Sequence, residues 1–209
     1  KGYGICIGRP IKDIDIRLIE INDEPIDTWS DELMVAPGEI GEITVKGALV
    51  SWEYFEDPRA TALAKIKEKG EIRHRMGDLG WMDDKGRIWF CGRKSHRVIT
   101  IDGTLFTIPC EAIFNRHPHV FRSALVGVGP RPKQKPVICI ELEKTPQEKS
   151  KKKITEELLE LAKESVLTQE IDTILYHKAF PVDIRHNAKI FREKLAVWVL
   201  QRMECGQGL

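Results

Sequence analysis

The sequence lacks the features that would place it in a membrane, a secretory pathway or a disulfide framework. None of its apolar runs approaches the ~20 residues that a membrane-spanning helix needs, and its first residues show no signal-peptide pattern. Its five cysteines are odd in number and are never spaced as Cys-x-x-Cys. Scattered free thiols are typical of a reducing compartment. We therefore predict a cytoplasmic protein with no transmembrane segment.

An excess of charge of either sign is also missing. Lysine and arginine number 33 against 32 aspartates and glutamates, which gives a net charge of +1. This balance does not predict binding to nucleic acid or to an anionic membrane. The run Lys-Ser-Lys-Lys-Lys at 149–153 could bind phosphates, but acidic residues follow it and no aromatic residue interrupts it. We interpret it as a solvated loop before a helix. No spacing of histidine and cysteine indicates a metal site.

The part of the chain up to residue 92 is dominated by strand patterns. Hydrophobic residues alternate along 14–21, and a second strand pattern covers 40–47. Pro58 suits the first turn of a helix, which we expect over 58–69 and closed by Gly70. The turn at 83–86 (Asp-Asp-Lys-Gly) separates two further strands, of which the second covers 87–91. We therefore predict a β-rich subdomain over 1–92.

Beyond Gly92, strand and helix patterns alternate. Hydrophobic residues recur at helical spacing in 154–168, where Thr155 is the expected N-cap. The other predicted elements are strands at 97–101, 122–128, 136–143 and 173–179 and helices at 109–116 and 188–202. We expect an α+β fold in which 93–209 forms a small, mixed α/β domain.

Three groups of polar residues could carry chemistry. Asp78 lies in the glycine-flanked turn Gly-Asp-Leu-Gly at 77–80, where a carboxylate can accept two hydrogen bonds from a ribose diol. Arg93 ends a later strand, and its planar fork can donate to ribose and phosphate oxygens. Lys189 stands in a polar loop before the last helix and could offset negative charge developing between a carboxylate and an α-phosphate. Taken singly, each is more simply read as a solvated surface residue.

In this order, the three groups resemble the C-terminal motifs of the adenylate-forming superfamily of acyl-CoA synthetases, luciferases and peptide-synthetase adenylation domains. The matching segments are Gly-Glu-Ile-Thr-Val-Lys-Gly at 41–47, Tyr-Phe-Glu-Asp-Pro-Arg-Ala-Thr at 54–61, Gly-Asp-Leu-Gly at 77–80, Gly-Arg at 92–93 and Ala-Lys at 188–189. The resemblance implies that 1–92 ends a large AMP-binding domain and that 93–209 is its mobile lid. It also implies that Asp78 and Arg93 bind ATP or AMP, that Ser95 is the hinge, and that Lys189 is catalytic. Mg²⁺ would be bound mainly by ATP and by residues upstream of this chain.

Two longer strings are similar to those of the olefin-biosynthesis β-lactone synthetases: Gly-Arg-Lys-Ser-His-Arg-Val at 92–98 and His-Asn-Ala-Lys-Ile-Phe-Arg-Glu-Lys-Leu-Ala at 186–196. Those enzymes activate a long-chain 2-alkyl-3-hydroxy acid as its adenylate, and the substrate's own hydroxyl then expels AMP. The stretch from Gly103 to Pro109, which in thioester-forming members lines the thiol tunnel, looks one residue longer than is usual. We therefore expect an ATP-dependent ligase that forms a β-lactone from a 3-hydroxy fatty acid. The alternative is a long-chain acyl-CoA ligase, for which coenzyme A would be a second substrate.

The family's phosphate loop and its adenine-binding Tyr-Gly-x-Thr-Glu segment are absent from the sequence. We expect both to lie upstream, so that this fragment alone would form no acyl-adenylate. An alternative from another functional class is a non-catalytic binding module with the same fold. A third is a weak nucleic-acid binder acting through 149–153.

Overall fold

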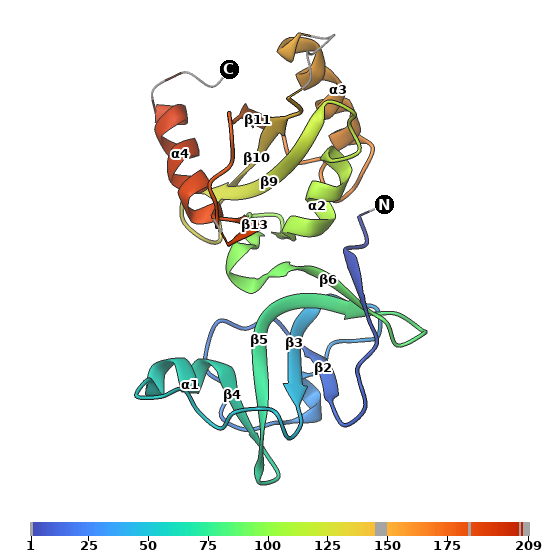
Figure 1. Ribbon diagram of the computed structural model, residues 1–209, viewed down its shortest axis with the longest axis vertical. Helices are drawn as coiled ribbons and strands as arrows, with labels where there is room; N and C mark the ends of the chain where they lie inside the picture. The colour runs from blue at the N-terminus through green and yellow to red at the C-terminus, as the bar shows by residue number, and fades with distance from the viewer. Residues whose placement is uncertain (1, 145–149, 184, 205, 207–209) are drawn as a thin grey trace. The chain divides into compact units, whose positions relative to one another are not determined.

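A computed structural model describes residues 2–144, 150–183, 185–204 and 206. They form two compact units, one of Tyr3–Ser95 and one of the described residues from His96 onward together with Gly2 (Figure 1). The sequence predicted a domain boundary between residues 92 and 93, and in the structure the two units divide between Ser95 and His96. Helices and largely antiparallel sheets together make the mixed fold that the sequence predicted.

The Tyr3–Ser95 unit is built on one antiparallel sheet of six strands. The order is β1-β6-β5-β3-β2, and β4 also pairs with β5. The strands are β1 (Ile5–Gly8), β2 (Asp15–Ile19), β3 (Gly41–Lys46), β4 (Lys65–Glu68), β5 (Glu71–Met82) and β6 (Ile88–Arg93). Two short helices, η1 (Asp31–Leu33) and α1 (Pro58–Ala64), complete the unit. Because β5 is twelve residues long, it pairs with β4 through its first half and with β6 through its second half.

The helix predicted over 58–69 is too long. Pro58 does lie in the first turn of α1, after the N-cap Asp57, but the helix ends at Ala64. The next four residues form β4, which pairs with the start of β5. Lysine and glutamate are good helix formers, which is why Lys65–Glu68 reads locally as a continuation of the helix. Pairing with a strand that follows in the chain overrides this preference.

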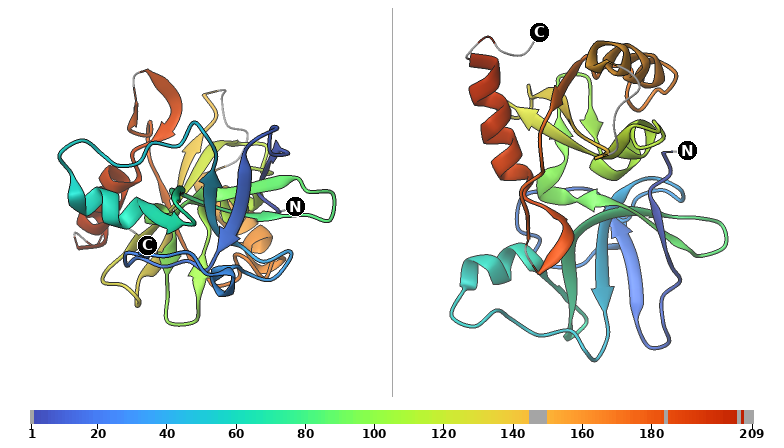
Figure 2. Two further views of the ribbon diagram at one scale, coloured as in Figure 1. Left: turned by 90° about the horizontal axis from the view of Figure 1, so that it is seen from below. Right: turned by 45° about the horizontal axis from the view of Figure 1, so that its top comes forward.

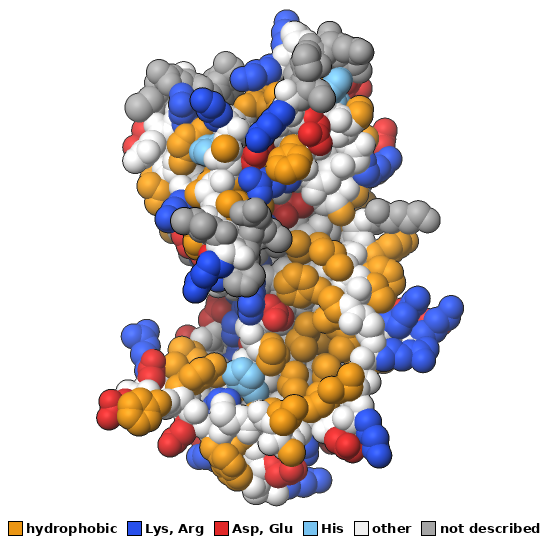
Figure 3. Space-filling model, in the orientation of Figure 1, with side chains coloured by type: hydrophobic (Ala, Val, Ile, Leu, Met, Phe, Trp, Pro, Cys, Tyr) orange, Lys and Arg blue, Asp and Glu red, His pale blue; other side chains and the backbone are white. Residues whose placement is uncertain are grey.

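Buried charges hold this sheet together. Glu42 on β3 is fully buried, and its Oε2 accepts a hydrogen bond from Arg75 Nη2 of β5 at 2.7 Å. Lys94 Nζ also lies 3.0 Å from the same carboxylate and donates to the carbonyl of Asn22. The two cations compensate the charge of this buried carboxylate. On the surface of the unit, hydrophobic side chains gather on one face (Figure 3), and its exposed large hydrophobic residues include Tyr3 and Ile5.

The other unit has a three-stranded sheet with helices on both faces (Figure 2). Its strands are β9 (Val120–Val128), β10 (Lys135–Leu142) and β11 (Thr173–Tyr176), with β10 central, antiparallel to β9 and parallel to β11. The helices are α2 (Thr107–Phe114), α3 (Lys151–Lys163) and α4 (Arg192–Glu204). The remaining elements are η2 (Lys94–His96), at the junction of the units, and the strands β7 (Val98–Ile99), β8 (Thr104–Leu105), β12 (Val182–Asp183) and β13 (His186–Ile190).

Alternation along β10 creates a core on each face of this sheet. Ile138 and Ile140 face α2 and α3, in a cluster that includes Leu158. Val137 and Cys139 face α4, in a second cluster that includes Leu195 and Val199. The apolar stripe predicted for 154–168 therefore packs on one face of the sheet, and α4 packs on the opposite face. No described helix is long and apolar enough to span a membrane.

The starts of the two long helices in this unit differ from the prediction. Helix α3 begins at Lys151 with Ser150 as its N-cap, and Thr155 instead lies inside the helix, with its hydroxyl donating to the Lys151 carbonyl. Lys151–Lys153 therefore form the first turn of α3 and are not a loop, while Lys149 lies outside the described residues. The last helix begins only at Arg192, because the residues before it form the strand β13.

Candidate functional site

Asp78 and Arg93 face each other across neighbouring strands. Asp78 lies on β5 and Arg93 is the last residue of β6, and the ladder makes them direct partners. Arg93 Nη1 lies 3.0 Å from Asp78 Oδ1 and 3.4 Å from the carbonyl oxygen of Met76. The two nucleotide-binding residues predicted from the sequence are thus brought together by strand register.

The Asp78 carboxylate has an unused acceptor. Its Oδ1 is buried, and among the described residues none completes a hydrogen bond to it, although the Arg93 guanidinium is close. Burial raises the pKa of Asp78 above its ordinary value, and the charge of Arg93 opposes that rise. Gly77, just before it, has φ +66°, and a Cβ built there would meet none of the described atoms within 4 Å. The sequence predicted a turn at 77–80, but these residues lie within β5, where Asp78 pairs with β6. A hydroxyl donor could approach this point of the strand without a steric obstacle.

These features suit a ribose better than a metal ion. A carboxylate with a spare acceptor beside a half-exposed guanidinium can hold a diol, because the acid accepts from hydroxyls and arginine donates to oxygens. The described part of the chain contains no group of three His, Cys, Asp or Glu side chains arranged to hold a metal ion. Residues suited to a nucleotide sugar are therefore present.

Ser95, the predicted hinge, lies in η2 (Lys94–His96), a single turn of 3-10 helix. It is exposed, and it is the last residue of the Tyr3–Ser95 unit. Its neighbour Lys94 is bonded to buried Glu42, as described above. Ser95, which the sequence predicted as the hinge, is therefore the last residue before the second compact unit begins.

Lys189 lies in the other unit, on β13, and is exposed. The prediction of a polar loop at this point is wrong, because β13 pairs with β12 in a small antiparallel hairpin. The positive charge of Lys189 contributes to holding the pKa of Asp183, on β12, below its ordinary value, after the larger effect of hydrogen bonds from Arg185. The ammonium is thus carried on a paired strand.

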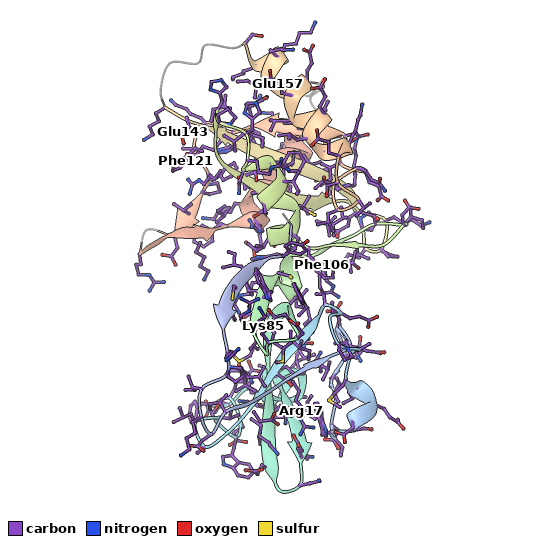
Figure 4. The ribbon with its side chains drawn as sticks, turned by 90° about the vertical axis from the view of Figure 1, so that its right-hand side faces the viewer. Arg17, Lys85, Phe106, Phe121, Glu143 and Glu157 are labelled. Carbon is purple, nitrogen blue, oxygen red and sulfur yellow. The ribbon has the colours of Figure 1, made fainter. Side chains whose placement is uncertain are left out.

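Sequence reasoning missed the buried polar residues around this hairpin. Glu111 on α2 and Glu141 on β10 are both nearly inaccessible, and Arg192 at the start of α4 reaches Glu111. Their positions lie too far apart in sequence for spacing to reveal contact. A different pair joins buried His117 to partly buried Glu157 of α3, which is labelled in Figure 4. His117 Nδ1 accepts the His119 N–H, so its Nε2–H donates to Glu157.

Comparison with known proteins finds olefin beta-lactone synthetases that match nearly the whole chain. No protein-family model matches the chain. It is 45% identical over 206 residues to an olefin beta-lactone synthetase of Xanthomonas campestris pv. campestris. This match covers 96% of this chain and 37% of that protein. The corresponding protein of Stenotrophomonas maltophilia is 46% identical, over 97% of this chain and 37% of its own length. A 2-succinylbenzoate–CoA ligase of Geobacillus kaustophilus is 34% identical over 44% of this chain and 18% of that protein.

Solved structures share the fold. An amide bond synthetase from Marinactinospora thermotolerans superposes with a TM-score of 0.73 at 19% identity, over 93% of this chain and 36% of the other. An o-succinylbenzoate coenzyme A synthetase from Bacillus subtilis, in complex with AMP, gives a TM-score of 0.68 at 23% identity, over 91% and 35%. The chain therefore spans little more than a third of the length of the two olefin beta-lactone synthetases that it matches. Its homologues are therefore olefin beta-lactone synthetases and acyl-CoA ligases, which it matches over their C-terminal part, and the solved structures that share its fold are adenylate-forming enzymes.

Proposed function

We propose that this chain is the C-terminal part of an ATP-dependent ligase that activates a fatty carboxylic acid as its acyl-adenylate. The observation that carries the proposal is the apposition of Asp78 and Arg93, in which a buried carboxylate oxygen lies 3.0 Å from the guanidinium without completing a hydrogen bond to it. Identity of 45–46% to olefin beta-lactone synthetases over nearly the whole chain supports it. We place the protein in the cytoplasm, in keeping with its free thiols.

In this proposal, Asp78 accepts hydrogen bonds from the ribose hydroxyls of ATP, and Arg93 donates to ribose and phosphate oxygens. The substrate carboxylate attacks the α-phosphorus, and the bond to pyrophosphate breaks with its electron pair leaving on pyrophosphate. Lys189 offsets the negative charge that develops between the two reacting anions. Mg²⁺ is bound mainly by the ATP phosphates and by residues outside this chain.

In this proposal the Tyr3–Ser95 unit is the end of an AMP-binding domain, and the unit from His96 onward is its mobile lid. Rotation at Ser95 would bring Lys189 to the α-phosphate for adenylation and withdraw it afterwards. A hinge of this kind needs only a few residues that absorb the change in backbone dihedral angles. Exposed Ser95, at the division between the units, is suited to this role.

We further propose that the substrate is a 2-alkyl-3-hydroxy acid and that the second step needs no external thiol. The 3-hydroxyl oxygen attacks the acyl carbonyl carbon, AMP leaves with the electron pair of its bond, and the hydroxyl proton is released. Because nucleophile and carbonyl belong to one molecule, ring closure has a high effective concentration. The second candidate is an acyl-CoA ligase, in which coenzyme A is the nucleophile. It is favoured by weaker matches to CoA ligases, such as the Geobacillus protein.

The test uses the longer protein that contains this chain, supplied with ATP and a racemic 2-alkyl-3-hydroxy acid. Release of AMP with formation of β-lactone in the absence of coenzyme A would support the proposal. Thioester formation that requires coenzyme A would select the ligase alternative. Failure to exchange pyrophosphate into ATP with any fatty acid would favour a non-catalytic binding module. The 209-residue chain by itself is expected to show no such exchange.

A further inference from the structure

The hairpin that carries Lys189 is too small to hold its own position. Its strands are β12, of two residues, and β13, of five, and their register shifts between Val182 and Asp183. An isolated two-stranded hairpin is marginally stable at best. We call the residues just before β12 (180–181) and just after β13 (191–192) the two roots of the hairpin. The position of Lys189 depends on how these roots are attached to the rest of the unit.

One root is attached through a buried ion pair. Arg192 follows β13 as the first residue of α4, and its Nη2 lies 2.8 Å from each oxygen of Glu111. Both side chains are nearly inaccessible, at 11% and 7% exposure. Glu111 Oε1 also accepts the backbone N–H of Leu125 at 2.8 Å, which fixes the carboxylate against the sheet. The start of α4 is thereby tied to α2 and β9.

The other root is attached through a second buried carboxylate. The backbone N–H of Phe180, just before β12, donates to Glu141 Oε2 at 2.8 Å. Arg122 donates to the same oxygen at 2.8 Å. The two roots then meet, because the Phe191 N–H donates to the Pro181 carbonyl at 2.9 Å. Each side of the hairpin thus begins from a fixed point in the core.

The ion pair is poorly explained by stability alone. A buried pair of opposite charges is often no more stabilising than apolar side chains of the same volume. Here, moreover, Arg192 Nη1 is buried and finds no hydrogen-bond partner within the described ranges. What the pair does supply is a directional attachment, since a guanidinium fixes both distance and orientation.

From this geometry we infer that Glu111 and Arg192 are positioning residues for Lys189, and that they act by fixing the root of the β12–β13 hairpin. The inference rests on the proposed function only for the role of Lys189; the attachment itself is independent of it. Glu111 and Arg192 do not touch the reacting atoms in this account. They determine where the ammonium stands when the lid closes.

The first test measures the attachment, by backbone hydrogen exchange on this chain. Glu111→Gln keeps an acceptor for Leu125 but removes the charge, and Arg192→Met keeps much of the side-chain volume. We expect either variant to speed exchange within 182–191 by at least about tenfold, since breaking one partner of a buried pair is a large change. Amides of β10 should be unaffected. Lys163→Met, which removes an exposed cation from α3 on the opposite face of the sheet, is the control.

Unchanged exchange in the hairpin would overturn the inference, and so would equal acceleration in β10, which would mean that the pair merely supports the core. The second test measures the partial reactions of the longer protein. Both variants should lower the rate of adenylation with little change in the KM for ATP, while the step after the adenylate keeps its rate. If the hairpin loosens but Lys189→Ala leaves adenylation intact, the proposed function fails and the attachment stands. If Lys189→Ala abolishes adenylation but Glu111→Gln does not slow it, the positioning role is wrong.

Discussion

Replacing Asp78 by asparagine should weaken nucleotide binding far more than it affects folding. Asparagine keeps the size of the side chain but turns two charge-assisted hydrogen bonds to the ribose into neutral ones. Hydrogen bonds to charged groups contribute about 1.5–3 kcal/mol and neutral ones about 0.5–1.5 kcal/mol, so the pair loses about 2–3 kcal/mol. That difference corresponds to a rise of about 30- to 150-fold in the Kd for AMP.

Folding stability should change little, for two opposing reasons. The lost ion partner, Arg93, is 56% exposed, and pairs in contact with water contribute at most about 1 kcal/mol. Against this, burial raises the pKa of Asp78, so the ionised carboxylate is held at some cost that asparagine does not carry. We expect the free energy of unfolding in urea to stay within about 1 kcal/mol of the unchanged protein.

The assay is calorimetric titration of AMP into the longer protein, with urea unfolding of the same samples. Asp84→Asn is the matched control, because Asp84 is an exposed carboxylate in the turn that follows β5. It should leave both quantities unchanged. An Asp78→Asn protein that binds AMP within about threefold of the original, a change of less than 1 kcal/mol, would refute the assignment of Asp78 to the ribose.

Three other perturbations test separate parts of the molecule. Glu42→Gln should lower the free energy of unfolding by about 3–5 kcal/mol, because it leaves buried Arg75 and partly buried Lys94 without their carboxylate; tryptophan fluorescence in urea measures this, and an unchanged midpoint would contradict it. Burial alone would raise the pKa of Asp83, but hydrogen bonds from Trp89 and Arg87 hold that pKa below its ordinary value. Ionised Asp83 therefore stabilises the folded protein above about pH 4, and this contribution is lost as the pH falls below that. Asp83→Asn should flatten the acid side of a plot of the urea midpoint against pH. An acid side as steep as before would count against these hydrogen bonds of Asp83. Lys189→Ala should slow pyrophosphate exchange by about 10²–10³-fold while sparing lactone formation from a preformed adenylate, and equal loss in both steps would contradict a swinging lid.

Local patterns predicted most of the fold. Alternation located β2 and the turn at 83–86 located the β5–β6 hairpin, because both signals come from neighbouring residues. The errors arose where distant pairing decides the structure. Lys65–Glu68 continues a helix by propensity and becomes a strand only because β5 lies beside it. The residues before Arg192 were likewise assigned to a helix, but they form β13 because they pair with β12.

The candidate site was predictable in part and for a physical reason. Asp78 and Arg93 lie on two strands that are joined by a short turn, which restricts their possible positions. In a β5–β6 hairpin with this register, the two residues are direct partners across the ladder. The contact between Glu111 and Arg192 has no such local origin, because it depends on how α2 and α4 reach the same region of the sheet from opposite ends of the domain sequence. Glutamate and arginine are common surface residues, so composition gave no signal that these two are buried.

A single arrangement recurs on both sides of the proposed hinge. Arg93 is exposed and available to a ligand, while the next residue, Lys94, is bonded to fully buried Glu42. Lys189 is exposed, while Arg192, three residues on, is bonded to buried Glu111. A long cationic side chain in solvent has many rotamers, and fixing the backbone beside it reduces the volume that its charge explores. Each cation that the proposed reaction uses is therefore placed by a neighbouring cation that the core has already immobilised.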